Sequence, residues 1–447
     1  MGWGPCFISL REAWPATVGL ALAAQGCGLF ETQQAFTAYS GSGSDASTHD
    51  AAAQGHDGGT TPPDGPLDAS NMADASREAV APGVSTLAAG GAHTCLISGG
   101  ALYCWGWNDH RQLGPTSCDA QQCGVTHVPM GDGAAPAVEV SAGYVHSCAR
   151  LADNSLHCWG DNAFGELGLG EVPPSNGAYG TVVAPSTPLV QVSVGARDTC
   201  AVANDGTVYC WGLNTQGQLA HASDAMALTQ PTQVPGLTGV AEVQLGGNWA
   251  CARLLDGGVD CWGNNVGAGY HCDSGALCTP IPTPIHGLGG LDGGAAHLAV
   301  GPLAACAIMA DTSVRCWGYN SDNELGNGSS QSGLAATTVV YVTSFLPLVD
   351  VVDLGMGSAG TCAVLVDGGV ACWGTTAFGG GAEAALVTMA PAVQVSLNTY
   401  EIQSSGFAGC VKRTDGGVSC LGSNAEEQLG RTGCDAGCAL GPVVGLP

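Results

Sequence analysis

Residues Cys200 to Leu219 read CAVANDGTVYCWGLNTQGQL. This stretch holds two cysteines ten positions apart, a tight-turn signal at Asn204-Asp205-Gly206, a Trp-Gly pair and an Asn-x-x-Gly-Gln-Leu run. Variants of it occur six more times along the chain. A repeat therefore decides the fold, and each motif has to be interpreted through its copies.

The second cysteine of each copy sets the period of the repeat. Successive copies are 54, 52, 51, 55, 56 and 48 residues apart, counted between Cys104, Cys158, Cys210, Cys261, Cys316, Cys372 and Cys420. Seven units between residues 84 and 447 give 52 residues each. That length suits one four-stranded blade of a β-propeller.

Each unit opens with an alternating apolar run, such as Leu189 to Ser193, which is typical of a half-buried strand. In six units the two cysteines then lie ten residues apart with an Asp at the midpoint: Asp153, Asp205, Asp256, Asp311, Asp367 and Asp415. This spacing predicts a three-residue hairpin loop with its last residue in the left-handed region. In the first unit the cysteines lie nine residues apart around Gly99-Gly100, which predicts a two-residue turn.

Both spacings place the two cysteines of a unit directly opposite each other on neighbouring antiparallel strands. We therefore predict seven cross-strand disulfides: Cys95–Cys104, Cys148–Cys158, Cys200–Cys210, Cys251–Cys261, Cys306–Cys316, Cys362–Cys372 and Cys410–Cys420. Three further close pairs follow Trp-Gly motifs: Cys118–Cys123, Cys272–Cys278 and Cys434–Cys438. Loop-stapling disulfides are expected there, with zinc as the alternative because His127 and His271 are near.

The pattern G-x-x-H-[ST]-C-x5-D-G-x-V-x-C-W-G-x-N-x-x-G-[QE]-L-G, assembled from the copies, resembles the repeat of the regulator of chromosome condensation family. The resemblance covers nearly all of residues 84 to 447 and implies an all-β, seven-bladed β-propeller. Units four and six depart from the pattern after Trp-Gly, and unit seven has Leu421-Gly422 in place of Trp-Gly. The Trp, Gly and Asn of the motif are expected to pack blades and form turns.

A propeller ring must also close. The tail Gly441 to Pro447 resembles the start of a segment between units, whereas unit one begins at Val84 without that segment. We therefore expect ring closure between the N- and C-terminal strands, which together would complete one blade and leave no open sheet edge.

Composition excludes some classes of partner. The chain has a net charge of −27, and from residue 84 onward it carries 28 acidic against 8 basic residues. Nucleic acids and anionic membrane surfaces are bound through Lys and Arg, so neither is an expected partner. Twenty-two cysteines point to an oxidising compartment.

The first 83 residues predict export and a tether. Residues 14–24, WPATVGLALAA, have the layout of a signal-peptide core, and Ala24-Gln25-Gly26-Cys27 resembles a bacterial lipobox. We expect a signal peptide over 1–26 and lipidation of Cys27, with an ordinary cleaved signal or an uncleaved or mis-started terminus as the alternatives. Residues 27–83, rich in Gly, Ser, Asp and Pro, are expected to be a disordered tether, and 84–447 the propeller.

Catalytic, cofactor-binding and metal-binding residues are not predicted. Gly355 to Gly360 fits G-x-G-x-x-G, but the next expected element is a strand and not the helix that a nucleotide site needs. His93 and His146 share one repeat position and are expected to have a turn or core role. The six midpoint Asp residues are expected to form turns, because one carboxylate per blade is too widely spaced for calcium.

Two functions are consistent with the sequence. The first is a non-enzymatic, monomeric binding scaffold that presents variable propeller loops to an unknown protein or glycan, outside the cytoplasm as a bacterial outer-membrane or cell-surface lipoprotein, or as a secreted protein. The second is a lyase or hydrolase that acts on a polymer at the propeller channel. We favour the scaffold, because fold accounts for the informative residues. The family's nuclear role on chromatin is not expected here, given the charge and the compartment.

Overall fold

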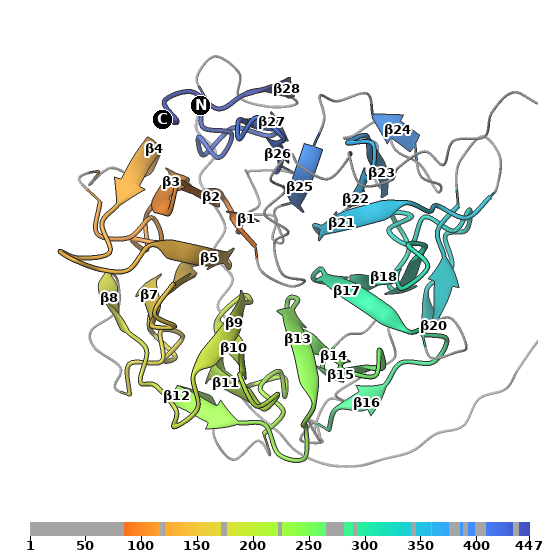
Figure 1. Cartoon of the computed structure of the whole chain (residues 1–447), viewed down its shortest axis with the longest axis horizontal. Coiled ribbons are helices and arrows are strands. Elements are labelled where there is room, and N and C mark those ends of the chain that lie inside the picture. The colour runs from red at the N-terminus through yellow and green to blue at the C-terminus, as the bar shows by residue number, and fades with distance from the viewer. Residues whose placement is uncertain are drawn as a thin grey trace, which may run out of the picture. The chain divides into compact units, whose positions relative to one another are not determined.

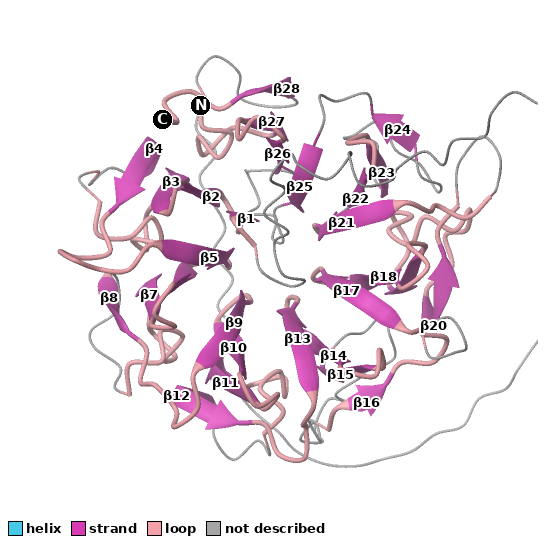
Figure 2. Cartoon of the chain, viewed as in Figure 1, coloured by secondary structure: helices cyan, strands magenta, loops and turns pink. Residues whose placement is uncertain are grey.

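The structure, a computed structural model, describes residues 85–447 except for 117, 119–120, 171–176, 222–225, 265–280, 289–292, 341–345, 359, 375–384, 388–391, 398–407 and 432–437. The described residues form seven four-stranded antiparallel sheets, arranged as blades around a central axis (Figure 1). They contain strands and loops only (Figure 2). The predicted all-β, seven-bladed propeller is therefore confirmed. No helix able to cross a membrane occurs in these ranges.

Every blade consists of four consecutive strands, numbered outward from the axis. Blades 1 and 2 contain β1 (Leu87–Ala89), β2 (His93–Ser98), β3 (Ala101–Trp107), β4 (Gln122–Val128), β5 (Ala137–Ala142), β6 (His146–Leu151), β7 (Leu156–Gly160) and β8 (Ala178–Thr181). Blades 3 and 4 contain β9 (Leu189–Val194), β10 (Asp198–Ala203), β11 (Val208–Leu213), β12 (Ala227–Gln233), β13 (Val240–Leu245), β14 (Trp249–Leu254), β15 (Val259–Gly263) and β16 (Thr283–Pro284). Blades 5 and 6 contain β17 (Ala295–Val300), β18 (Ala304–Met309), β19 (Val314–Gly318), β20 (Gly333–Thr338), β21 (Val351–Met356), β22 (Gly360–Leu365), β23 (Val370–Gly374) and β24 (Ala385–Val387). Blade 7 contains β25 (Ala392–Leu397), β26 (Ala408–Arg413), β27 (Val418–Gly422) and β28 (Cys438–Pro442).

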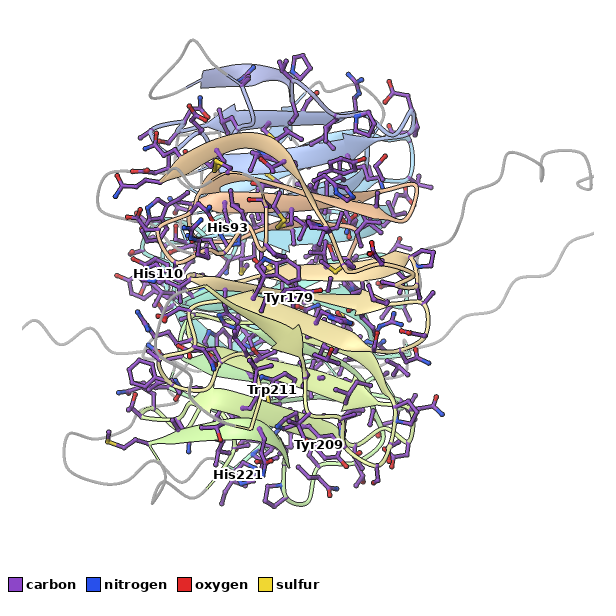
Figure 3. The ribbon with its side chains drawn as sticks, turned by 90° about the vertical axis from the view of Figure 1, so that its left-hand side faces the viewer. His93, His110, Tyr179, Tyr209, Trp211 and His221 are labelled. Carbon is purple, nitrogen blue, oxygen red and sulfur yellow. A yellow bond between two sulfur atoms is a disulfide. The ribbon has the colours of Figure 1, made fainter. Side chains whose placement is uncertain are left out.

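The antiparallel order gives the ring two different faces. The loops that join the first strand of a blade to its second, and the third to its fourth, lie on one face, which we call the loop face. The hairpins between the second and third strands and the links between blades lie on the other, the hairpin face. In the side view, His110 of the loop face lies at the left-hand edge of the ring and Trp211 lies deeper (Figure 3).

The two cysteines of each blade face each other across its middle strands, as predicted. Cys200 is the register partner of Cys210, and their Cα atoms are 4.1 Å apart. Hydrogen-bonded and non-hydrogen-bonded residue pairs alternate along an antiparallel ladder. Ala203 and Thr207, joined by the hydrogen bond from Ala203 N to Thr207 O, lie three residue pairs from the cysteines, so Cys200 and Cys210 form a non-hydrogen-bonded pair. The equivalent disulfides of the other blades are also present: Cys95–Cys104, Cys148–Cys158, Cys251–Cys261, Cys306–Cys316, Cys362–Cys372 and Cys410–Cys420. Each closes a short loop, for which chain entropy gives about 2 to 3 kcal/mol of stabilisation.

The midpoint Asp residues form the hairpin turns. Asp205 Oδ1 accepts a hydrogen bond from the backbone N–H of Thr207 at 3.1 Å, and the other five make the same bond two residues on. The residue after the Asp is left-handed, with φ of 77° at Gly206 and 66° at Thr312. In the first blade both residues of Gly99-Gly100 have positive φ. The predicted loop types are confirmed.

The Trp-Gly pair and the Asn-containing turn belong to one motif in the sequence but act at two different junctions in the ring. Asn162 Oδ1 accepts a hydrogen bond from Leu167 N at 2.9 Å and closes the turn that contains Glu166. The Glu166 carbonyl accepts the indole N–H of Trp211, in the next blade, at 2.8 Å. Four further junctions have the same indole bond: Trp159 to Gln112, Trp262 to Gln218, Trp373 to Glu324 and Trp105 to Gln428. We call this contact the indole lock.

Two junctions differ from these five. Between blades 6 and 7, Leu421 stands where Trp would donate. Between blades 4 and 5, Trp317 Nε1 is buried and has no hydrogen-bond partner among the described residues, and the turn that would supply its acceptor falls within residues 265–280, outside the described part. In both cases the preceding unit is one whose sequence departs from the repeat after Trp-Gly.

Ring closure between the N- and C-terminal strands is confirmed, but the expected shared blade is wrong. Blades 1 and 7 are each built from four consecutive strands, so the chain ends do not share a blade. The tail instead continues as the expected inter-unit segment: Val443 N donates to Val418 O at 3.0 Å, and Val443 packs in one buried cluster with Trp105 of blade 1. The ring closes through side chains, including Trp105 Nε1 to Gln428 O at 2.9 Å and Ala89 N to Ser396 Oγ at 2.9 Å. Because these contacts already satisfy the buried polar groups, strand exchange is not needed.

The closing junction should contribute as much stability as an internal one. We predict that Trp105→Phe and Trp159→Phe each lower the free energy of unfolding by about 1 to 3 kcal/mol, because each removes the indole donor from a buried carbonyl. Urea unfolding with the disulfides intact measures both. A lower free energy of unfolding for Trp159→Phe with no change for Trp105→Phe would contradict closure of the ring through the indole lock.

In the Asn-containing turn of blade 5, Glu324 stands where blade 1 has Gln112, and its carboxyl should make the stability of the fold depend on pH. Glu324 Oε2 accepts from Asp322 N at 3.0 Å, and burial raises the pKa of the Glu324 carboxyl to about 7. Between pH 4.5 and about 7 the Glu324 carboxyl keeps its proton in the folded protein but loses it in the unfolded chain. The free energy of unfolding therefore falls as the pH rises through this range. We predict that Glu324→Gln is close to wild type at pH 4 and more stable by up to about 3 kcal/mol at pH 8.

Gln112→Glu is the matched reverse variant, because Gln112 holds the equivalent position in blade 1 and its Oε1 accepts from His110 N. It should introduce the same loss of stability at high pH. Equal effects at pH 4 and pH 8 for either variant would show that the buried carboxyl does not titrate in this range.

Candidate functional site

The innermost strands carry polar side chains at one shared position, counted from the paired cysteines. These residues are Thr86, Glu139, Gln191, Glu242, His297, Asp353 and Gln394. An innermost strand is a sheet edge, whose free N–H groups need acceptors. One blade supplies them to the next: Val192 N donates to Glu139 Oε1 at 3.0 Å and Val395 N to Asp353 Oδ2 at 2.7 Å. This polar ring therefore joins the blades around the channel.

Two arginines neutralise glutamates of the polar ring. Arg150 Nε lies 2.8 Å from Glu139 Oε2, and Arg253 Nε lies 3.2 Å from Glu242 Oε2. Burial raises the pKa of Glu139 to about 7, although Arg150 opposes this. For Glu242, burial raises the pKa, but the attraction of His297 and Arg253 outweighs it and holds the pKa below its usual value.

His297 connects two carboxylates across three blades. Its Nδ1 lies 2.9 Å from Glu242 Oε1, and its Nε2 lies 4.0 Å from Asp353 Oδ1. Burial lowers the pKa of His297, but these two carboxylates outweigh burial and raise it above its usual value. Burial likewise raises the pKa of Asp353 to about 6, against the attraction of His297. The group is a buried ion network whose oxygens already hold backbone or side-chain donors, which is a stabilising arrangement and not a nucleophile paired with a base.

His93 and His146 have the core role that the sequence predicts. His93 Nε2 lies 2.7 Å from Ser147 Oγ, and His146 Nε2 lies 2.8 Å from Thr199 Oγ1. Both contacts cross to the next blade. Burial lowers the pKa of each histidine to about 3, so both are neutral at physiological pH.

A second group of charged side chains surrounds Arg197 on the loop face, where blades 2 and 3 meet. Arg197 Nη1 donates to Asp161 Oδ2 at 3.0 Å and lies 3.6 Å from Glu166 Oε1. Its guanidinium carbon is 5.3 Å from the centre of the Phe164 ring, within range of a cation–π contact. Burial raises the pKa of Glu166 to about 7 and that of Asp198 well above its usual value.

Aromatic side chains of blades 1 and 2 continue this group. His110 Nδ1 lies 3.8 Å from the same Asp161 oxygen that Arg197 contacts. The ring centres of His110 and Trp107 are 5.2 Å apart, and those of Trp107 and Tyr144 are 6.4 Å apart. Loops from three consecutive blades thus form one aromatic and charged surface.

The remaining predicted sites have mixed outcomes. Cys118 and Cys123 form a disulfide, as expected, rather than a metal site. Cys27 and the pairs Cys272–Cys278 and Cys434–Cys438 involve residues outside the described part. Gly360 begins strand β22, so Gly355 to Gly360 lacks the helix of a nucleotide site. Within the described ranges, no cluster of three or more His, Cys, Asp or Glu is arranged to hold a metal ion.

Sequence reasoning missed the polar ring and the Arg197 surface. Aligning the units on their cysteines shows a polar residue in every innermost strand, which is a signal for the ring. The Arg197 surface gives no such signal, because its members come from three units and the residue type at a shared position changes: Asp161 stands where Trp107 does, and Phe164 where His110 does.

Comparison with known proteins agrees with the fold. The family models described as Regulator of chromosome condensation (RCC1) repeat match residues 137–166 and 189–218 in one form, and 99–150 and 205–252 in another. Among solved structures, human WBSCR16 superposes with a TM-score of 0.60 at 21% identity over 70% of this chain and 84% of that one. Yeast RCC1 (Prp20), in a structure with Kap60, gives 0.58 at 20% identity over 71% and 78%. At these identities the superpositions show the fold alone.

Sequence relatives cover parts of the chain. The Ultraviolet-B receptor UVR8 of Arabidopsis thaliana is 34% identical over 137 residues, which is 30% of this chain and 31% of that protein. The E3 ubiquitin-protein ligase HERC2 of Homo sapiens is 27% identical over 255 residues, 56% of this chain but 5% of that protein. RUG3, a mitochondrial RCC1 domain-containing protein of Arabidopsis thaliana, is 28% identical over 252 residues, 54% of this chain and 55% of that protein. The chain thus spans little more than half of RUG3 and far less of the other two. With its seven blades, its indole locks and these matches, the chain carries regulator of chromosome condensation (RCC1) repeats, which the family models match over residues 99–166 and 189–252.

Proposed function

We propose that this protein is a non-enzymatic scaffold that binds another protein through its loop face. One observation carries the proposal: apart from the turn-forming Asp residues of the hairpin face, the residues that repeat between blades are buried in the ring, whereas the loop-face residues differ from blade to blade. The position after Trp-Gly shows this contrast. It holds Trp107, Asp161, Leu213, Asn264 and Tyr319 in the first five blades, while the Asn that follows it in blades 1, 2, 3 and 5 is buried in the turn.

Structures of relatives support a protein as the partner. One structure holds Kap60 bound to yeast RCC1, and another study of Prp20p from Saccharomyces cerevisiae concerns its binding to Gsp1p and histones. A propeller of this fold can therefore bind proteins. Variable loops on a rigid scaffold are also where binding residues are usually found.

We further propose that the protein acts outside the cytoplasm. Eight disulfides among the described residues suit an oxidising compartment. Cys27, after its lipobox-like sequence, would carry the lipid anchor on a bacterial surface. Cys27→Ala should then move the protein from the membrane fraction to the soluble fraction of the producing cells. An unchanged distribution would show that Cys27 is not the anchor.

A photo-crosslinking residue at the exposed Ala163, on the loop face of blade 2, should give discrete protein adducts on intact producing cells. The same residue at Asp205, on the hairpin face, should give none of these adducts. Adducts that form equally from both faces would contradict the loop face as the binding surface. Turnover of a polysaccharide or peptide panel by the purified protein would instead favour the polymer-acting lyase or hydrolase.

A further inference from the structure

Resting on the proposed function, we infer that the surface formed by Trp107, His110, Tyr144, Phe164 and Arg197 is the centre of the protein-binding site. We call it the aromatic–arginine patch. It binds a segment of the partner that presents a carboxylate, from Asp, Glu or a chain terminus, beside an aromatic or aliphatic side chain.

The patch is continuous across three blades. Trp107 and His110 come from the third strand and following loop of blade 1, Tyr144 and Phe164 from two loops of blade 2, and Arg197 from blade 3. Asp161 joins the two ends, because its Oδ2 lies 3.0 Å from Arg197 Nη1 and 3.8 Å from His110 Nδ1. The patch is therefore one prearranged surface, which lowers the ordering cost of binding.

Arg197 has donors available for a ligand. Its contacts with Asp161 and Glu166 both use Nη1, and within the described part of the chain neither Nε nor Nη2 has an acceptor. The side chain is 29% exposed. The Nε–H and Nη2–H groups form one edge of the guanidinium, which binds a planar carboxylate in the two-bond geometry that Lys cannot reproduce.

Asp161 contacts Arg197 only at Nη1. The other two neighbouring carboxyls, of Glu166 and Asp198, are buried, and burial raises the pKa of both, which favours their uncharged forms. The rest of the propeller is strongly acidic, with 28 acidic and 8 basic residues from position 84 onward, so an acidic group is repelled from most of the surface.

The composition of the patch favours a protein over other ligands. Trp, Tyr and Arg are the residues that most often dominate protein–protein binding energy, when they lie together and are partly desolvated. Trp107, Tyr144 and Phe164 are each half-buried, so they have fixed positions and still expose ring surface. A polyphosphate ligand is disfavoured, because the surrounding charge is negative.

The other blades lack this combination and provide a matched control. Ala92, Val145, Asn248 and Leu303 hold the position of Arg197 in blades 1, 2, 4 and 5. Blade 5 has an aromatic residue, Tyr319, at the position of Trp107, but no unit other than that of blade 3 has an arginine at the position of Arg197. Tyr319→Ala therefore removes an equivalent aromatic side chain from the same face outside the patch.

Selection from a random phage-displayed peptide library on the intact, oxidised chain tests the inference. We expect enriched peptides to contain Asp or Glu next to an aromatic or aliphatic residue. Trp107→Ala, Tyr144→Ala and Arg197→Lys should each weaken their binding about tenfold or more, whereas Tyr319→Ala should leave it within about twofold. Arg197→Lys keeps the charge beside Asp161, and an unchanged thermal midpoint for each variant shows that the fold is intact.

The outcomes separate the inference from the proposed function. Peptides that bind the loop face but lose affinity only with Tyr319→Ala would overturn the patch and keep the scaffold. Peptides with a basic motif, or equal binding to wild type and Arg197→Lys, would overturn the carboxylate. Peptides that bind only the hairpin face, or none at all, would overturn both.

Discussion

The ring depends on one contact, the hydrogen bond from a buried indole N–H to a backbone carbonyl of the preceding blade. Propeller blades share no strand pairing, so polar groups buried between them must find partners in side chains or turns. Trp211 and the Glu166 carbonyl show how this is arranged: the Asn162 side chain shapes the turn, and the turn supplies the acceptor. Each repeat unit of the sequence thus supplies an indole donor to the junction with the preceding blade and an acceptor turn to the junction with the following blade.

This division explains why units six and seven depart from the repeat together. Unit six has Thr375-Thr376 in place of the Asn region, and Leu421 of unit seven lacks the indole that would use the turn. Unit four departs at the same place, whereas unit five keeps Trp317. A junction without the indole hydrogen bond loses its contribution to stability, so the junction of blades 6 and 7 is expected to be the weakest.

Local features could be predicted from the sequence, because spacing encodes them. The hairpin at Asp205 and the Cys200–Cys210 disulfide involve residues within ten positions of each other, and their geometry follows from strand periodicity. Contacts between units were harder to predict. Ring closure was expected as a shared blade, because nothing in the sequence shows that Gln428 and Ser396 already accept hydrogen bonds from the first blade. The Arg197 surface was missed for the same reason: it has no periodic signal.

The central claim is that the indole locks set the stability of the ring junction by junction. Hydrogen exchange of the intact, oxidised protein, followed by mass spectrometry, tests it most directly. We predict slow exchange in the Trp-bearing strands β7, β11 and β15, where the lock is present, and faster exchange in β27, where Leu421 replaces the Trp. Equal protection of all four strands would contradict the claim.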